Sequence, residues 1–295
     1  MRAAERFQVT LVVGLVLCAL LVTSVAIALQ PGDAAIAPFR AAPGVRPTES
    51  APIGIDQAKI NWKLAWREEF NGAGAPDPAR WNVAVGNGIN GYGHKALQYY
   101  DRASAVQDGK GSLVLTARPR KNGQTCWYGP CAYTSGRIDS KGKISYGYGR
   151  YTARMRTPTG VGLWPAFWLQ TVATTEAAYS EIDVLETIGN EPNRVQGFAH
   201  TLKGRVGKGE LWLDEPLSAG YHVYGADWTP TEITWTLDGR PYAQLKRYKA
   251  WPFTTPMFLI LNLQVGGEWP GKPDAATRFP ARMHVDWIRI YKGTA

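Results

Sequence analysis

Apolar residues occur in many short segments separated by glycine, proline, asparagine and aspartate. After Trp62 most of these segments have the length and composition of strands, and helical periodicity is scarce. Leu237-Asp-Gly-Arg240 predicts a hairpin turn. Many short strands with regular turns are typical of an all-β sandwich or jelly roll. The pattern predicts strands over residues 112–117, 149–156, 182–187, 195–200, 222–228, 232–237, 257–263 and 284–291.

The N-terminal segment differs from the rest of the chain. Arg2 and Arg6 precede an uncharged apolar run over 9–29, which is about long enough to span a bilayer as a helix. Residues 1–29 therefore predict either a signal peptide, cleaved near Ala26-Ile-Ala28, or an uncleaved membrane anchor. Residues 30–60 are rich in Ala and Pro and predict a linker. Both alternatives place residues 61–295 outside the cytoplasm, secreted or membrane-anchored, with membrane contact through the N-terminal segment alone.

The segment Glu181-Ile-Asp-Val-Leu-Glu186 carries three acids among strand-forming core residues. Strict alternation would put Glu181 and Asp183 on one face and Glu186 on the other. A β-bulge near Val184 or Leu185 would return Glu186 to the face of the other two acids. Clustered carboxylates raise at least one pKa, and glycoside hydrolysis requires a protonated carboxyl beside an ionised one. The alternative is a solvent-facing acidic strand, although Glu and Asp are poor strand residues.

Six motifs follow one another between about Trp62 and Lys292. They are Trp66-Arg-Glu-Glu-Phe-Asn71, Trp164-Pro-Ala-Phe-Trp168, the acids Glu181/Asp183/Glu186, Tyr221-His-Val-Tyr-Gly-Ala-Asp-Trp228, Gly266-Gly-Glu-Trp-Pro-Gly271 and Val285-Asp-Trp-Ile-Arg-Ile-Tyr291. In this order they resemble glycoside hydrolase family 16, in its laminarinase-like (endo-β-1,3-glucanase) branch. The resemblance implies that residues 61–295 are a family 16 catalytic domain with the β-jelly-roll sandwich of the concanavalin A-like lectin/glucanase fold. Its substrate would lie in a cleft across the concave sheet.

The resemblance also implies the roles of the acids. Glu181 would be the nucleophile and Glu186 the acid/base, with Asp183 between them. The implied activity is that of an exported, retaining endo-hydrolase of β-1,3-linked or mixed-linkage glucans, which needs no cofactor for catalysis. One alternative is a hydrolase or transglycosylase of another β-glycan, such as an anionic galactan or an envelope polysaccharide. A carbohydrate-binding protein without turnover is less favoured, because both catalytic glutamates are present.

Further residues are implied to bind substrate. For Trp164 and Trp168 the alternative role is core packing. For His200 it is a structural role, and for Arg137 a surface ion pair. The segment 91–98 departs from the family pattern, because Tyr92, His94 and Ala96 stand where Trp, Asn and an acidic residue are usual. We expect weaker binding of laminarin there, since a carboxylate acceptor is missing. The implied substrate-binding residues are Trp164, Trp168, His200, Gln264, Trp269, Arg137, Tyr92 and His94.

A structural calcium ion is implied away from the cleft. Its ligands by resemblance would be Glu69, the carbonyl of Gly111 and Asp286, and oxygen ligands suit calcium. Cys126 and Cys131 flank four residues, and in an exported protein they are expected to form a small-loop disulfide. Metal binding by these two cysteines is the weaker alternative.

The formal net charge of +9 bears on partners. A positive surface favours an anionic polysaccharide or an anionic cell envelope. The chain has no basic run or nucleic-acid motif, so we expect a polysaccharide partner and no nucleic acid. We also expect a monomer.

Overall fold

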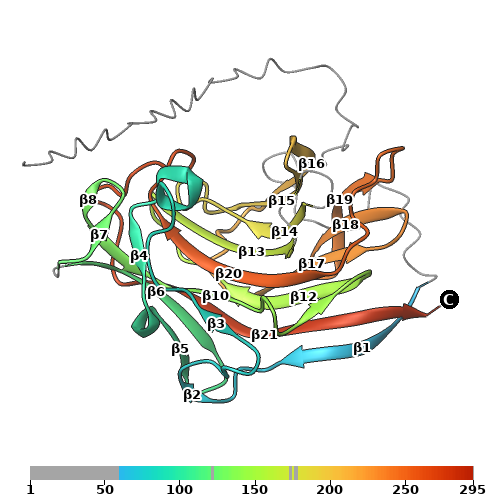
Figure 1. The fold of residues 1–295 in the computed structure, drawn as a ribbon, viewed down its shortest axis with the longest axis horizontal. Coiled ribbons are helices and arrows are strands. Elements are labelled where there is room, and N and C mark those ends of the chain that lie inside the picture. The colour runs from blue at the N-terminus through green and yellow to red at the C-terminus, as the bar shows by residue number, and fades with distance from the viewer. Residues whose placement is uncertain (1–59, 121–122, 173–174, 176–178, 295) are drawn as a thin grey trace, which may run out of the picture. The chain divides into compact units, whose positions relative to one another are not determined.

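The computed structural model describes residues 60–120, 123–172, 175 and 179–294 (Figure 1). The predicted signal or anchor segment at 1–29 lies outside the described residues, as does the predicted linker apart from Ile60. Within the described part, no helix is long and apolar enough to cross a membrane. Its helical segments are a π-helical turn over Gly91–Lys95 and a 3-10 turn over Arg102–Ser104.

Two antiparallel sheets lie one above the other in Figure 1, which confirms the predicted all-β sandwich. One sheet has the order β19-β18-β17-β12-β21-β6-β5-β2, with β1 paired to β21. Its strands are β1 (Asn61–Glu68), β2 (Ala73–Gly74), β5 (Ala105–Asp108), β6 (Leu113–Pro119), β12 (Gly149–Arg156), β17 (His222–Trp228), β18 (Glu232–Leu237), β19 (Arg240–Lys246) and β21 (Ala281–Thr294). Two short strands, β4 (Gln98–Tyr100) and β9 (Tyr133–Ser135), join it through β6.

The second sheet carries the acidic segment, and we call it the cleft sheet. Its order is β16-β15-β14-β13-β20-β10-β3, with β11 paired to β20. Its strands are β3 (Asn82–Val83), β10 (Arg137–Asp139), β11 (Ser145–Tyr146), β13 (Leu163–Thr171), β14 (Ser180–Glu186), β15 (Arg194–Thr201), β16 (Gly204–Trp212) and β20 (Met257–Val265). All eight predicted strands are present, and β12, β17 and β18 have the predicted bounds.

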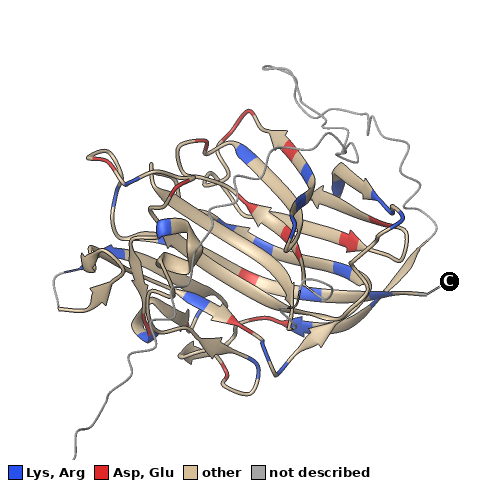
Figure 2. Ribbon diagram, turned by 45° about the horizontal axis from the view of Figure 1, so that its top comes forward, with Lys and Arg blue, Asp and Glu red and all other residues tan. Residues whose placement is uncertain are grey.

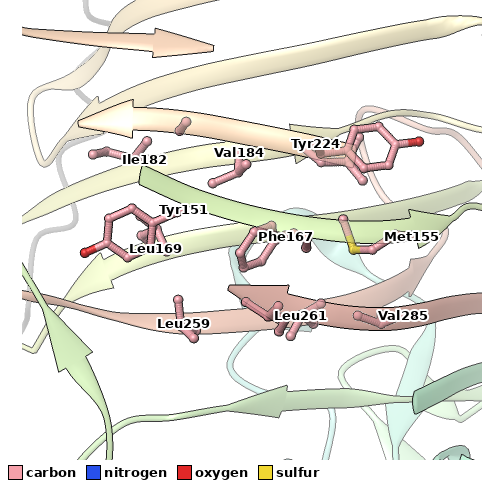
Figure 3. Close-up of a cluster of buried hydrophobic side chains, with 14 of the residues drawn as sticks. Tyr151, Met155, Phe167, Leu169, Ile182, Val184, Tyr224, Leu259, Leu261 and Val285 are labelled. Atoms are coloured by element: carbon pink, nitrogen blue, oxygen red, sulfur yellow. The ribbon is translucent and has the colours of Figure 1, made fainter. Parts of the chain in front are cut away.

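The core fills the space between the sheets because alternate residues of each strand point inward. On β12, Tyr151 and Met155 are fully buried, whereas Thr152 and Arg154 between them are partly exposed. Figure 3 shows these inward side chains packing against those of the cleft sheet. Removing this apolar surface from water is the main stabilising term of the sandwich. It also leaves the outer face of the cleft sheet free for polar chemistry.

The predicted bulge interrupts β14. On the β13 side, Phe167 pairs with Leu185 but Trp168 pairs with Asp183, so that Val184 is the extra residue. The freed backbone is supported from the other sheet, because the indole of Trp235 on β18 donates a hydrogen bond of 2.8 Å to the carbonyl of Asp183. The bulge turns both Val184 and Leu185 into the core.

Gly197 on β15 makes room for this support. A Cβ atom at this position would lie 2.2 Å from the Trp235 ring, which no side chain could tolerate without a shift. Because two consecutive residues, Val184 and Leu185, point into the core, Glu186 returns to the outer face of the cleft sheet with Glu181 and Asp183.

Two local predictions are confirmed elsewhere. Leu237 pairs with Arg240 across Asp238 and Gly239, whose φ angles of 51° and 76° are those of a two-residue hairpin turn. Cys126, in the short strand β7 (Thr125–Cys126), forms a disulfide with Cys131, which directly follows the short strand β8 (Gly129–Pro130).

Basic residues are scattered over strands and loops in Figure 2 and do not gather in one stripe. The expected absence of a nucleic-acid partner stays a prediction, and so does the expected monomer.

Candidate active site

A cleft of about 740 Å³ crosses the outer face of the cleft sheet. It brings together side chains from β10, β13, β14, β15, β16 and β20 and from the turn over Gly91–Lys95. Every residue that was expected to act in catalysis or substrate binding lines it. These are Tyr92, His94, Arg137, Trp164, Trp168, Glu181, Asp183, Glu186, His200, Gln264 and Trp269.

Several lining residues were not expected from the sequence. Tyr179 precedes Glu181 by two positions and Gln170 follows Trp168 by two, so the period of a strand could have indicated both. Phe198 likewise precedes His200 by two positions. Asn262 lies two positions before Gln264. The other lining residues that were not expected are Ala166, Thr201, Leu202 and Arg205.

Glu186 is held in position by Trp164. The indole Nε1 of Trp164 donates a hydrogen bond of 2.8 Å to Oε1 of Glu186. Burial raises the pKa of the Glu186 carboxyl well above its usual range, and the negative charges of Asp183 and Glu181 raise it further. The hydrogen bond from Trp164 acts in the opposite direction and is the smaller effect. Burial and the neighbouring charges therefore favour the protonated form of Glu186.

Glu181 has a polar environment on one of its oxygens. The hydroxyl of Tyr179 donates a hydrogen bond of 2.5 Å to Oε2 of Glu181, and Nε2 of Gln170 lies 3.3 Å from the same oxygen. Gln170 stands directly across from Glu181 in the pairing of β13 with β14, and its Nε2 also donates to the Tyr179 hydroxyl at 3.0 Å. Two hydrogen-bond donors therefore face a single carboxylate oxygen of Glu181.

Asp183 lies deepest of the three acids, with 2% of its surface exposed. Its burial and the negative charge of Glu181 raise its pKa well above the usual range. Nε2 of His200 lies 3.3 Å from Oδ2 of Asp183, but without hydrogen-bonding geometry, so this oxygen has no hydrogen-bond partner among the described residues. Burial lowers the pKa of His200, which favours a neutral ring. Asp183 can therefore exchange a proton with its neighbours instead of forming a fixed ion pair.

Ligand atoms of Glu181, Asp183 and His200 lie within 4.8 Å of one another, the one group in the described chain with spacing suited to a metal ion. Because Tyr179 and Gln170 already donate to Glu181, the group is better explained by acid–base chemistry than by metal binding.

Aromatic rings form one wall of the cleft. The rings of Trp164 and Trp269 meet edge to face at 4.8 Å, and Phe198 packs on Trp269 at 6.0 Å. His94 packs edge to face on Trp164 at 5.4 Å. Aromatic faces of this kind suit the apolar face of a sugar ring.

Elsewhere in the cleft, a guanidinium group lies between two aromatic rings. The guanidinium of Arg137 lies 5.0 Å from the ring centre of Tyr92 and 5.1 Å from that of Trp168. Trp168 is fixed in turn by a hydrogen bond of 2.8 Å from its Nε1 to Asn262. Cation–π contact on both sides fixes the guanidinium, so that its N–H groups are preorganised for hydroxyl or acid groups of a ligand.

The expectation for position 96 is wrong. Ala96 is fully buried, and its carbonyl accepts hydrogen bonds from Nε1 of Trp127 at 2.9 Å and Nδ2 of Asn87 at 3.3 Å. The preceding turn winds left-handed, with positive φ from Asn90 through Gly93, and this winding presents Tyr92 and His94 to the cleft while residue 96 faces inward. A missing carboxylate at this position therefore cannot weaken a sugar contact directly.

The three residues implied for calcium converge in the structure. Glu69 follows β1, Gly111 precedes β6, and Asp286 is an extra residue of β21 beside both strands. However, Arg289 binds the Glu69 carboxylate through two contacts of 3.1 Å, and Arg154 binds Asp286. Because both carboxylates are engaged by guanidinium groups, these residues as placed do not fit a calcium ion.

Comparisons with known proteins agree with this architecture. Residues 94–289 match the model of glycosyl hydrolases family 16. The beta-glucanase of Rhodothermus marinus is 37% identical over 257 residues, which are 79% of this chain and 86% of that protein.

Two solved structures are similar. The endo-beta-1,3-glucanase of Pyrococcus furiosus has a TM-score of 0.74 and 33% identity over 79% of this chain and 95% of its own. The laminarinase catalytic domain of Thermotoga maritima has a TM-score of 0.73 and 35% identity over 80% of this chain and all of its own. Shared motifs, sandwich and family model lead to one conclusion: the chain belongs to glycosyl hydrolases family 16 and is a glycoside hydrolase.

Proposed function

We propose that this protein is an exported, retaining endo-hydrolase of β-1,3-linked or mixed-linkage glucans. The observation that carries the proposal is the bulge in β14, because it places Glu181, Asp183 and Glu186 on one cleft floor in three different environments. The similar proteins, whose names specify beta-glucanase, endo-beta-1,3-glucanase and laminarinase, support the choice of glucan.

The two glutamates divide the chemistry. Glu181, whose Oε2 is held by Tyr179 and Gln170, attacks the anomeric carbon, while the protonated Glu186 gives its proton to the departing glycosidic oxygen. Glu186 then removes a proton from water, which releases the sugar from Glu181 with net retention. Asp183, whose pKa is raised by burial and by Glu181, is the neighbour through which the proton state of Glu181 is adjusted.

The open shape of the cleft supports internal cleavage. Rings and polar groups line it on both sides of β14 in the strand order, with Trp168 on β13 and Arg137 on β10 to one side, and Phe198 and His200 on β15 to the other. A polymer can therefore occupy both sides of the reacting bond at once. Export is supported by the apolar run over 9–29 and by the Cys126–Cys131 disulfide, which suits an oxidising compartment.

One observation favours a second candidate. Two guanidinium groups, Arg137 and Arg205, line the cleft, and they could bind the acid groups of an anionic β-glycan. A hydrolase of an anionic galactan is therefore the second candidate, within the same mechanism.

A reducing-sugar assay separates the candidates. We expect turnover of laminarin and lichenan, and little or none of xyloglucan, agarose and carrageenan. Glu181→Ala and Glu186→Ala should each abolish turnover, and azide should restore it to Glu181→Ala with a product of inverted configuration. Glu215→Gln, which alters an exposed carboxylate outside the cleft, is the matched control and should retain wild-type activity. Near wild-type turnover by Glu181→Ala would refute the mechanism, and turnover of carrageenan alone would favour the second candidate.

A further inference from the structure

Two side chains outside the acid triad converge on the proposed nucleophile. Tyr179 lies two residues before Glu181, on the same side of the chain, and Gln170 faces Glu181 from β13. The Tyr179 hydroxyl donates a hydrogen bond of 2.5 Å to Oε2 of Glu181. Nε2 of Gln170 donates to the Tyr179 hydroxyl at 3.0 Å and to the same Oε2 at 3.3 Å. Among the described residues, both donors to Glu181 therefore act on Oε2.

The hydroxyl of Tyr179 remains a donor throughout the working pH range. Its pKa is raised, first by burial and then by the negative charge of Glu181. The backbone beside it is fixed, because the N–H of the buried Ser180 donates a hydrogen bond of 3.0 Å to Oγ1 of Thr171, and the Ser180 hydroxyl donates one of 3.1 Å to the carbonyl of Pro252. The phenol is thus held in place from the core side.

We propose that Tyr179 is a positioning residue for the nucleophile: with Gln170 it holds Oε2 of Glu181, so that Oε1 attacks the sugar and carries the covalent bond. The inference rests on the proposed function of Glu181. In the first step the Oε1–carbon bond forms while the glycosidic bond breaks, and the leaving oxygen takes the proton of Glu186. In the second step water attacks the anomeric carbon and gives a proton to Glu186, and the electron pair of the Oε1–carbon bond returns to Glu181.

The two steps place opposite demands on Tyr179. A phenol binds a carboxylate more strongly than it binds the carbonyl oxygen of an ester. Its hydrogen bond therefore weakens as Glu181 becomes glycosylated and strengthens again as the carboxylate is released. Tyr179 should accelerate the second step more than the first, because charge returns to Oε2 only in the second.

The surroundings of Glu181 allow this effect to be isolated. The titratable and charged groups that face it are Tyr179, Asp183 and Glu186 from its own segment, His200 from β15 and Arg205 from β16. Gln170 from β13 adds an uncharged donor. Replacing Tyr179 by Phe removes one donor from Glu181 and leaves the other groups in place.

The test is Tyr179→Phe, assayed with a dinitrophenyl β-laminaribioside, whose good leaving group makes the second step limiting. We expect kcat to fall about tenfold or more, as for loss of one charge-assisted hydrogen bond. KM should fall in parallel, and mass spectrometry should detect sugar bound to Glu181.

Two further variants complete the test. Gln170→Met should give a smaller change in the same direction, and Tyr248→Phe, a half-buried tyrosine outside the cleft, should match the wild type. An unchanged kcat together with no detectable sugar on Glu181 for Tyr179→Phe would overturn the inference. Hydrolysis by the wild-type enzyme tests the proposed function, whereas the ratio of variant to wild type tests the inference, so the two can fail separately.

Discussion

The indole of Trp164 donates a hydrogen bond of 2.8 Å to Oε1 of Glu186, the proposed acid/base. The two side chains meet because Ala166 on β13 pairs with Glu186 on β14, which places Trp164 two positions away on the same face. An indole N–H can donate but cannot accept. The proton of the neutral Glu186 must therefore be carried by Oε2, which orients the acid for transfer.

Trp164→Phe tests this orientation. The hydrogen bond from Trp164 lowers the raised pKa of Glu186, so its loss should raise that pKa further. Since Glu186 must be protonated for the first step, the basic limb of kcat/KM should move to higher pH, and the maximal rate should fall about tenfold. The measurement is the pH profile on laminarin. Trp269→Phe, which contacts the Trp164 ring but not Glu186, is the control, and an identical shift in both variants would contradict the assignment.

Ala96→Glu tests the burial of the segment that departs from the family pattern. Ala96 is fully buried, so a glutamate there would place an unpaired carboxylate in the core. We expect a loss of roughly 3–5 kcal/mol in the free energy of unfolding, measured by chemical denaturation. Ala275→Glu, at an exposed turn, should cost nothing measurable. A stable Ala96→Glu enzyme with a lowered KM for laminarin would show that residue 96 reaches the cleft.

Chelation tests the region of Glu69 and Asp286. Because Arg289 and Arg154 engage these carboxylates, we expect EDTA followed by calcium to leave the melting temperature unchanged. Arg289→Gln should remove a partner of Glu69 and lower the melting temperature slightly, since the pair is partly exposed. A clear fall in melting temperature with EDTA, reversed by calcium, would show that calcium displaces the arginines.

Truncation tests the independence of the domain from its N-terminal segment. The cleft is lined by residues from Tyr92 onward, and the first strand begins at Asn61. A chain that begins at Ala51 should therefore be soluble and as active on laminarin as the full-length protein, compared by kcat/KM and by melting temperature. Insoluble or inactive protein would show that residues before Ala51 pack on the domain.

Features that depend on the local pattern of apolar and polar residues could be predicted from the sequence. Alternation in 149–156 and 222–228 predicted β12 and β17 with their observed bounds, because a strand turns successive residues to opposite faces. Three acids in the segment from Glu181 to Glu186 required a bulge if they were to act together, and the bulge lies at Val184. The motifs identified the family for the same reason, since each is a contiguous segment.

Contacts between side chains that are remote in sequence could not be predicted in this way, because they depend on how the strands pair and how the sheets pack. Gln170 reaches Glu181 through strand pairing, and Trp235 supports the bulge from the opposite sheet, 52 residues along the chain from Asp183. Arg289 binds Glu69 across 220 residues. Hydrogen bonds and ion pairs depend on distances of a few ångströms between segments that are remote in sequence, and a local pattern contains no information about those distances. Position 96 was misjudged for this reason, because a left-handed turn decided which of its residues would face the cleft.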